Sequence, residues 1–461
     1  LERILGKISR LKVNPREVLS LGLSLGMIPI VQAELKKCRK KALGKIAGSF
    51  VNTNKIVKKI NVNLKEDAPG NTKQGGYISD GIDKELDELR SLSIGGKQWI
   101  KKFQESERKT TGIPSLKIGF NKVFGYYIDV TKTHQHKVPE TYIRKQTLVN
   151  SERYITEELK KYEEKILTAE EKIEAIESRI FDDLCHQILK ESHSIQTNAK
   201  ILNRLDLLSS FSRTALTNDY VRPKLTKKAI LEIKAGRHPV VEQLIPATDR
   251  FIPNDTKMDI SSSQIHLITG PNMAGKSTYL RQVGLLVLMS QIGSFIPANK
   301  ATIGIVDRLF TRVGASDNLA GGESTFLVEM NEAANILNNA TPKSLILLDE
   351  IGRGTATFDG LSLAWAITEF LHNHSRVGAR TLFATHYHEL TELENKLKRL
   401  KNYKAAVKEF DDKIIFLRTI IPGISDKSYG IHVAQMAGLP NDVIERAKEI
   451  LEHHINKGSV H

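Results

Sequence analysis

Residues 265–278 read IHLITGPNMAGKST, and the expected architecture of the second half of the chain follows from them. Ile265 to Thr269 predicts a short buried strand, the pattern G-x-x-x-x-G-K-S comes next, and an apolar helix begins at about Thr278. Glycines in such a loop let backbone N–H groups turn towards a phosphate at the N-terminus of the helix. The stretch therefore predicts a nucleotide-binding α/β domain with a largely parallel sheet.

The loop residues are expected to hold ATP or ADP together with Mg²⁺. Lys276 would place its charge on the β- and γ-phosphates and assist catalysis, and the Ser277 hydroxyl would ligate the metal ion. The remaining contacts are expected from Gly270, Pro271, Asn272, Met273, Ala274, Gly275 and Thr278.

A second apolar stretch, SLILLDE at residues 344–350, ends in two acids. Ligands of open α/β sheets lie at the C-terminal edge of the strands. Asp349 is therefore expected to hold Mg²⁺, and Glu350 is expected to orient or deprotonate the attacking water. A strand ending in Asp-Glu is common by itself, but downstream of a phosphate loop it is informative.

Two further features narrow the class of ATPase. His386 follows another apolar strand and is a candidate sensor of the γ-phosphate. The glycine-rich stretch NLAGGESTF at residues 318–326 opens an apolar helix whose N-terminus can approach an anion. In ATPases of the ABC type such an element completes the site of the opposite subunit, so a homodimer is expected.

The first half of the chain is expected to be mostly helical. Apolar residues at helical spacing predict helices in residues 1 to about 60 and in residues 83–107. From Ser115 to Val130 apolar residues alternate, which predicts a small β insertion that continues to about Asn150. Its basic residues are candidate contacts to DNA phosphates, although a solvated sheet surface is an equally good interpretation. The candidates are Lys117, Lys122, Lys132 and Arg144.

Apolar residues from Ile155 to Ile180 follow a 4-3-4-3 spacing that predicts a coiled-coil seam. No proline occurs between Pro139 and Pro223. We therefore expect a helical stretch of roughly 60 residues, or about 90 Å, paired with an antiparallel helix at residues 83–107.

Composition limits the class of protein. The net charge of +15 suits a nucleic-acid partner, although many basic proteins bind none. Cys38 and Cys185 lie far apart and are expected to be buried thiols in a reducing cytoplasm. We expect no leader before the fold. Because no uninterrupted apolar stretch approaches the roughly 20 residues of a membrane helix, we also expect no membrane partner.

Several stretches together resemble the bacterial MutS mismatch-repair family. They are FNKVFGYYIDVTKTH, RKQTLVNSERYITEELKKYE, GRHPVVE, ITGPNMAGKSTYLRQVG, GGESTFLVEMNEAANIL, LLDEIGRGTATFDGLSLAWA, FATHYHEL and SYGIHVAQMAGLP, in the order of the family. The resemblance implies an ATP-dependent DNA repair clamp: a dimer that binds mismatched double-stranded DNA and a MutL-like partner in the bacterial cytoplasm, near the nucleoid. The mismatch-reading and connector domains of the family are missing, so we expect a fragment or a natural truncation.

The resemblance also implies the domain organisation: a multidomain helical protein with a small β insertion, followed by an α/β domain. The expected domains are a helical core with the first lever arm (1–112), a β-rich DNA clamp (113–150), a second lever arm with core helices (151–225), an ABC-type P-loop ATPase (226–425) and a C-terminal helical dimerisation segment (426–461).

Further roles come from the resemblance alone. Phe251 would stack on the adenine, with a core residue as the less favoured alternative, and Asn272 would contact phosphate. Ser324 would reach the γ-phosphate of the partner subunit's nucleotide, with the acidic Glu323 beside it as a departure from the basic or neutral residue expected there. Asp359 would lie in a loop that crosses between the sites or would cap a helix. His386 would act as a switch.

Two other functions compete with mismatch repair. One is an ABC ATPase whose coiled-coil arms act in DNA break repair or chromosome tethering. Such a protein would carry its coiled coil between the two ATP motifs, whereas here the arms precede both. The other is a DNA-binding scaffold without catalysis, which the intact Lys276, Asp349 and Glu350 argue against.

Overall fold

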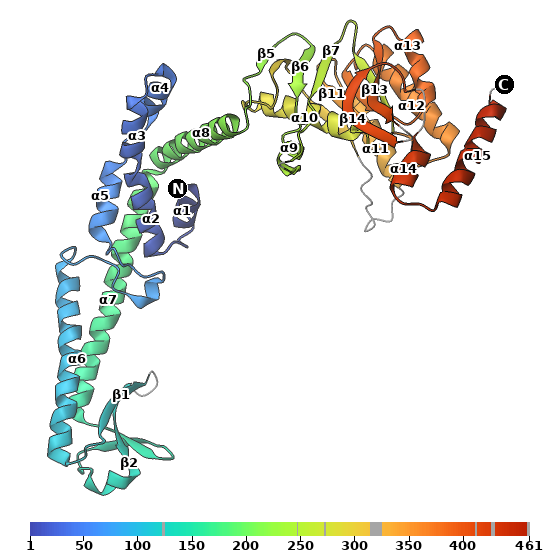
Figure 1. The fold of residues 1–461 in the computed structure, drawn as a ribbon. Coiled ribbons are helices and arrows are strands. Elements are labelled where there is room, and N and C mark those ends of the chain that lie inside the picture. Colours follow the sequence, from blue (N-terminus) through green and yellow to red (C-terminus); the bar gives the residue numbers. More distant parts are fainter. Residues whose placement is uncertain are drawn as a thin grey trace. The chain divides into compact units, whose positions relative to one another are not determined.

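The computed structural model describes residues 1–121, 125–246, 248–271, 273–313, 325–410, 413–425 and 429–458 (Figure 1). The chain divides into two compact units, Leu1–Asp206 and Leu207–His461. The division falls within helix α8 (Ser192–Thr217).

The first unit begins with a cluster of helices around one apolar core. They are α1 (Glu2–Ile8), α2 (Pro15–Gly26), α3 (Ile28–Lys37), α4 (Lys41–Ser49) and α5 (Asn54–Asn63), and a short 3-10 turn η1 (Thr72–Gln74) follows. A capping box between Asn14 and Glu17, with Pro15 in the first turn, starts α2. A Cβ on Gly22 would lie 2.9 Å from Ile60, so glycine allows α2 to approach α5 closely.

Two expectations about this cluster were wrong. Cys185 is buried, but Cys38 is exposed, because it lies at the solvated end of α3.

The second expectation was that no apolar stretch approaches the length of a membrane helix. In the described part of the chain one helical span, Pro15–Lys37, is long and apolar enough to cross a membrane by length and composition alone. Its Leu21 and Leu25 pack in the same apolar core as Ile60, while only 28% of the apolar window of this span is buried.

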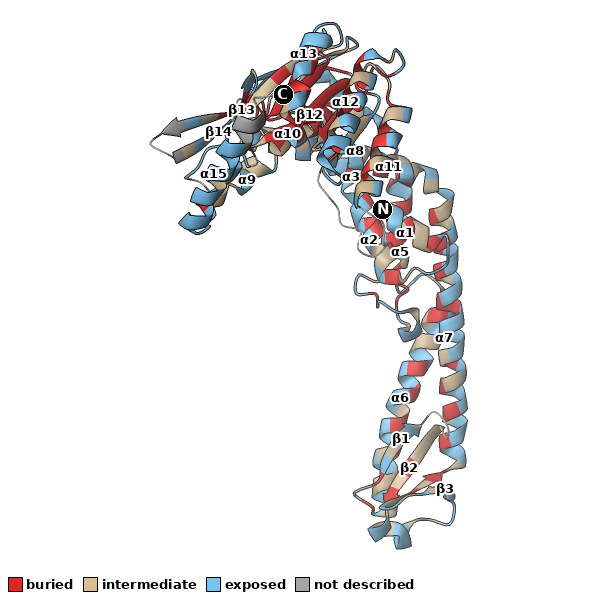
Figure 2. Ribbon diagram, turned by 90° about the vertical axis from the view of Figure 1, so that its right-hand side faces the viewer, coloured by how far each residue is buried: buried red, intermediate tan, exposed pale blue. Residues whose placement is uncertain are grey.

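Two long helices, α6 (Lys84–Thr111) and α7 (Glu157–Lys190), lie side by side in Figures 1 and 2, with buried residues recurring along both. The ring of Trp99 stacks on that of Tyr162 with a centroid distance of 3.5 Å. A Cβ on Gly96 would come within 2.6 Å of the Ile166 side chain. These contacts pair the helices as the apolar spacing predicts.

The helical stretch has about the expected extent, with 34 residues in α7 and 26 in α8, but the expectation of one continuous helix was wrong. Ile155 belongs to a strand rather than to the helix, and α7 ends at Lys190, after which α8 begins at Ser192. The apolar 4-3-4-3 spacing stops at Ile180, so it does not require the helix to continue without a break after that residue.

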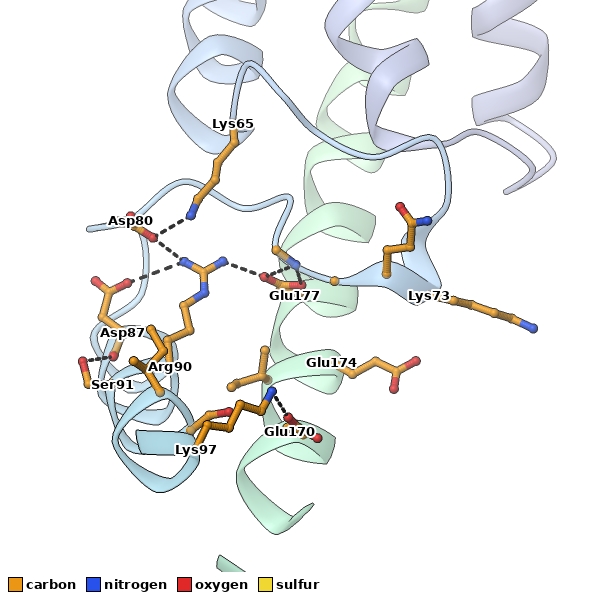
Figure 3. Close-up of a pocket in the computed structure, with 16 residues that line it drawn as sticks. Lys65, Lys73, Asp80, Asp87, Arg90, Ser91, Lys97, Glu170, Glu174 and Glu177 are labelled. Carbon is orange, nitrogen blue, oxygen red and sulfur yellow. Dashed lines mark hydrogen bonds and ion pairs between the residues drawn. The ribbon is translucent and has the colours of Figure 1, made fainter. Parts of the chain in front are cut away.

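Figure 3 shows an ion-pair network where the chain enters α6. The carboxylate of Glu177 accepts hydrogen bonds from Arg90 at 2.6 Å and from the backbone amide of Gly76 at 2.8 Å. Asp80 pairs with both Arg90 and Lys65. The network connects α6, α7 and the loop that follows α5.

The predicted β insertion is an antiparallel sheet with the strand order β1-β2-β4-β3. Its strands are β1 (Lys117–Asn121), β2 (Gly125–Thr131), β3 (Ile143–Thr147) and β4 (Ser151–Ile155), with the 3-10 turn η2 (Lys132–Lys137) between β2 and β3. Ile128 and Val130 pack with Phe103 of α6 and Leu159 of α7 in one apolar cluster. The sheet is therefore fixed to the end of the helix pair.

The second unit contains a six-stranded sheet with the order β10-β11-β12-β8-β13-β14, parallel except for β14. Its strands are β8 (Ile265–Thr269), β10 (Leu309–Arg312), β11 (Leu345–Asp349), β12 (Arg380–Ala384), β13 (Leu400–Phe410) and β14 (Lys413–Pro422). A second sheet has the order β5-β9-β6-β7, from β5 (Lys224–Thr226), β6 (Ile230–Gly236), β7 (Asn254–Asp259) and β9 (Lys300–Gly304).

Helices cover both faces of the six-stranded sheet. On one face Leu345 and Leu347 pack in a cluster with α10 (Lys276–Gln291). On the other, Ile346 and Leu348 pack with α11 (Thr325–Asn339) and α12 (Thr357–Asn373). The remaining elements are α9 (Val241–Leu244), η3 (His388–Glu392), α13 (Leu393–Lys396), α14 (Gly430–Met436) and α15 (Asn441–Gly458).

Candidate nucleotide site

The strand order brings three sequence motifs to one edge of the sheet. The parallel strands β8, β12 and β11 are neighbours, and their register places Ile268, Ala384 and Asp349 in one row. The phosphate loop follows β8, the two acids end β11, and His386 follows β12. Because the carboxyl ends of parallel strands meet at the same edge, these residues converge there.

The phosphate loop has the backbone that a close approach to phosphate requires. Gly270 and Gly275 have φ values of 130° and 97°, and the non-glycine Met273 has a φ of 70°. The amine of Lys276, which is almost fully buried, donates to the carbonyl oxygens of Gly270 at 2.6 Å and Pro271 at 3.1 Å. Thus the loop wraps around the amine that is expected to meet the phosphates.

Charge around Lys276 is arranged for an anionic ligand. Desolvation lowers the pKa of Lys276, while the nearby carboxylates of Glu350 and Asp349 oppose this shift. A desolvated ammonium gains from the binding of a further negatively charged group, such as a phosphate.

Asp349 and Ser277 suit a hard cation. Burial raises the pKa of Asp349, against the effect of a hydrogen bond with Ser277. The Oδ1 atom of Asp349 is buried and has no hydrogen-bond partner among the described residues. A carboxylate and a hydroxyl, with phosphate oxygens and water, form the oxygen ligand set that Mg²⁺ prefers. No group of three or more His, Cys, Asp or Glu side chains within the described ranges is placed to hold a metal ion by itself.

Glu350 occupies a constrained position directly after β11. Its φ of 56° lies in the left-handed region, which is costly for a residue with a side chain. Its backbone amide donates to Ala384 at 2.9 Å, and its carboxylate forms an ion pair with Arg353.

His386 lies at the same edge, and its ring is solvent-exposed. Partial desolvation lowers its pKa, while the charge of Glu350 opposes this shift. The backbone of Thr385 is fixed to β8 by a hydrogen bond to Ile268 at 3.0 Å. His386 therefore emerges from a rigid strand end.

Phe251 lines a hollow of about 190 Å³ beside the phosphate loop, together with Met273, Gly275 and Thr278. The sequence did not point to Arg418 of β14 or Gln282 of α10, which line the same hollow. Phe251 thus lines a hollow and is in none of the apolar core clusters of the described residues. Asp359 lies in the first turn of α12, where its charge favours the helix, and it is exposed.

A second hollow, of about 330 Å³, lies over Ser277, Asp349 and Glu350. It is also lined by residues that sequence reasoning missed: Arg281, Arg312, Thr325, Glu329, Arg353 and Gly354. These residues come from four separate parts of the chain, and only the arginines could have been suspected from their charge.

Four residues singled out in the sequence lie outside the described residues: Lys122, Asn272, Glu323 and Ser324. The other candidate DNA contacts are on the small sheet of the first unit. Lys117 begins β1, Lys132 begins η2 and Arg144 lies on β3, and all three are exposed. Arg144 is 3.6 Å from Glu152.

Comparison with known proteins agrees with both halves of this description. Residues 81–172 match the model of MutS family domain IV, and residues 266–454 match MutS domain V. The chain contains two domains of the MutS family. The resemblance to MutS seen in the sequence is confirmed.

Curated relatives match nearly the whole chain. The DNA mismatch repair protein MutS of Salinibacter ruber is 55% identical over 453 residues, which cover 98% of this chain and 50% of that protein. The MutS proteins of Parabacteroides distasonis and Methanosarcina acetivorans are 52% and 51% identical, again over 98% of this chain, and the matches cover 52% and 50% of those proteins. The chain spans about half the length of the relatives it matches.

Proposed function

We propose that this chain supplies the ATP-hydrolysing and DNA-backbone-binding parts of a MutS-type DNA mismatch repair protein. The observation that carries the proposal is the convergence of Lys276, Asp349 and Glu350 at one edge of the parallel sheet. The MutS domain V match covers the same residues.

In the proposed reaction each residue has a separate task. The amine of Lys276 leaves the loop carbonyls to neutralise the β- and γ-phosphates, and the Phe251 ring packs on the base. Ser277 and Asp349 would hold Mg²⁺, which supplies charge neutralisation of the phosphate oxygens. Glu350 orients the attacking water and accepts its proton, and His386 senses the γ-phosphate from the neighbouring strand.

The active form in this proposal is a homodimer in which Ser324 of one chain completes the site of the other. The exposed apolar side chains of α15, Val443, Ile450 and Leu451, support a role of this helix in dimerisation. In the longer relatives, the paired helices α6 and α7 would act as lever arms, and the small sheet would act as a clamp on DNA.

Contacts to DNA would come from Lys117, Lys132 and Arg144. Their exposure on one small sheet supports a sequence-independent role, because cationic contacts to phosphates carry no base information. Recognition of a mismatch and of a MutL-like partner is proposed for the whole repair protein. The family matches do not favour chromosome tethering or break repair.

Steady-state ATP hydrolysis by the purified chain, with and without duplex DNA, tests the proposal. We expect turnover that requires Mg²⁺ and that changes when DNA is added. Turnover that is indifferent to DNA would leave an ATPase but contradict the clamp.

A further inference from the structure

The peptide group of Gly352, two residues after Glu350, is held from both sides. Its N–H donates to the carboxylate of Glu329 at 2.5 Å, and its carbonyl oxygen accepts from the hydroxyl of Tyr387 at 2.9 Å. Glu329 belongs to α11, and Tyr387 directly follows His386. Two elements of the nucleotide site therefore meet at one backbone group next to the proposed catalytic acid.

This stretch of backbone has little room to move. Gly352 has a φ of 89°, and a Cβ there would lie 2.6 Å from the carbonyl oxygen of Gly360. A Cβ on Gly360 would in turn lie 2.3 Å from the Tyr387 hydroxyl. Since these groups pack backbone against backbone, a displacement of the Gly352 peptide must also displace the turn that carries Glu350.

Glu329 is also connected to the elements around the glycine-rich stretch 318–326. Its side chain is buried, and its carboxylate lies 3.5 Å from the guanidinium of Arg312 at the end of β10. In sequence, Arg312 precedes the glycine-rich stretch and α11 continues from it. A second contact exists at Gly354, where a Cβ would lie 3.2 Å from Phe326 of α11.

We infer that Glu329 and Tyr387 are positioning residues for ATP hydrolysis, which act on Glu350 through the Gly352 peptide. The inference rests on the proposed function. Neither residue lines the hollow beside Phe251, so their loss should leave the contacts to the base intact. Glu329 does line the second hollow, over Ser277, Asp349 and Glu350, where its hydrogen bond to Gly352 fixes the catalytic turn. The same peptide transmits the position of α11 to the catalytic turn.

Three variants of the full chain test this assignment. Tyr387→Phe removes one oxygen atom, Glu329→Ala removes the acceptor, and Glu329→Gln keeps an acceptor without charge. A hydrogen bond to a neutral group contributes about 1 kcal/mol and one to a charged group about 2, so kcat should fall about fivefold in Tyr387→Phe and about 30-fold in Glu329→Ala. Glu329→Gln should retain more activity than Glu329→Ala.

Comparing the effect of each variant on nucleotide binding with its effect on kcat distinguishes a positioning role from a general loss of structure. The Kd for a fluorescent ADP analogue and the KM for ATP should change by less than about twofold in all three variants. Tyr403→Phe is the matched control, because its half-buried ring stacks on His266, and it should leave kcat unchanged. Thermal unfolding of Tyr387→Phe should match that of this control.

The kinetic results distinguish failure of the proposed function from failure of the positioning assignment. No turnover in the wild-type chain overturns the proposed function and the inference with it. Wild-type turnover with kcat unchanged in both Tyr387→Phe and Glu329→Ala overturns the inference alone. A fall in kcat that is matched by weaker ADP binding or by lower thermal stability than in Tyr403→Phe also overturns it, because the two residues would then support the fold rather than the catalytic turn.

Discussion

Arg90 donates to the fully buried carboxylate of Glu177 at 2.6 Å, and this pair joins the two long helices (Figure 3). Truncation at Arg90 would leave the Glu177 charge buried with the Gly76 amide as its main remaining partner. Arg90→Ala should therefore lower the free energy of unfolding of the first unit by about 3 kcal/mol or more.

Tryptophan fluorescence can follow this unfolding selectively. In a Trp365→Phe background, Trp99 on α6 is the remaining tryptophan and reports on the first unit. The control is Arg179→Ala, which removes an exposed ion pair with Asp83 and should cost less than about 1 kcal/mol. Equal losses in the two variants would mean that burial of the Glu177 pair does not stabilise the helix junction.

Alanine substitutions at the two neighbouring glycines of α6 should change the stability of the first unit in opposite directions. A Cβ on Gly96 would lie 2.6 Å from Ile166, whereas a Cβ on Gly95 would have no atom within 4 Å in the described part of the chain. Gly95→Ala should stabilise the first unit by up to about 1 kcal/mol, because alanine favours a helix. Gly96→Ala should destabilise it by about 1–3 kcal/mol through overpacking. Urea unfolding measures both, and stabilisation by Gly96→Ala would show that the helices separate easily.

His266 should make the second unit sensitive to acid. Its ring is buried against Tyr403, and desolvation lowers its pKa to about 3. An unfolded histidine titrates near pH 6.5, so between about pH 3 and 6.5 the unfolded state binds more protons, and stability falls as the pH falls by up to about 1.4 kcal/mol per pH unit. Above about pH 6.5 the effect vanishes.

In a Trp99→Phe background, Trp365 is the remaining tryptophan and reports on the second unit. There the free energy of unfolding should depend more steeply on pH with His266 in place than in His266→Gln. The exposed His136 in the first unit provides the control variant, His136→Gln, which should leave the slope unchanged. If His266→Gln retained the full slope between pH 4.5 and 6.5, other groups would be the source of the acid sensitivity.

Basic residues of the small sheet should contribute to DNA affinity without selectivity. Lys117→Ala or Lys132→Ala should weaken binding by a similar factor on matched and mismatched duplexes, and each should reduce the slope of log K against log salt by about one. Lys12→Ala, an exposed lysine outside the sheet, is the control. A loss confined to mismatched DNA would contradict phosphate contact.

The sequence predicts the parts of the fold that depend on local patterns. Glycine spacing and flanking apolar residues locate the loop around Lys276, and the strand rule places Asp349 and Glu350 at the same edge. Apolar spacing likewise predicts the pairing of α6 with α7. The break at Glu191 was missed because no proline or glycine marks it and both flanking sequences favour helix.

Contacts between distant segments could not be read from the sequence. The hydrogen bond of Gly352 to Glu329 joins residues 23 positions apart, and Arg418 reaches the hollow beside Phe251 from β14. Glu329 lies in the quoted stretch GGESTFLVEMNEAANIL, but no local pattern there indicates which distant backbone group its carboxylate contacts. Such contacts depend on the order of strands and on helix packing, which local spacing does not specify.

The rate of ATP hydrolysis by Glu350→Gln tests whether the carboxylate at the end of β11 takes part in the reaction. This variant keeps the side-chain volume but removes the carboxylate that would accept the proton. We expect turnover to fall by about 100-fold or more while ADP binds with unchanged affinity, and we expect Glu66→Gln, an exposed control in the first unit, to match the wild type. Turnover of Glu350→Gln within about twofold of the wild type would show that this carboxylate has no part in hydrolysis, and the proposed role of Glu350 would be wrong.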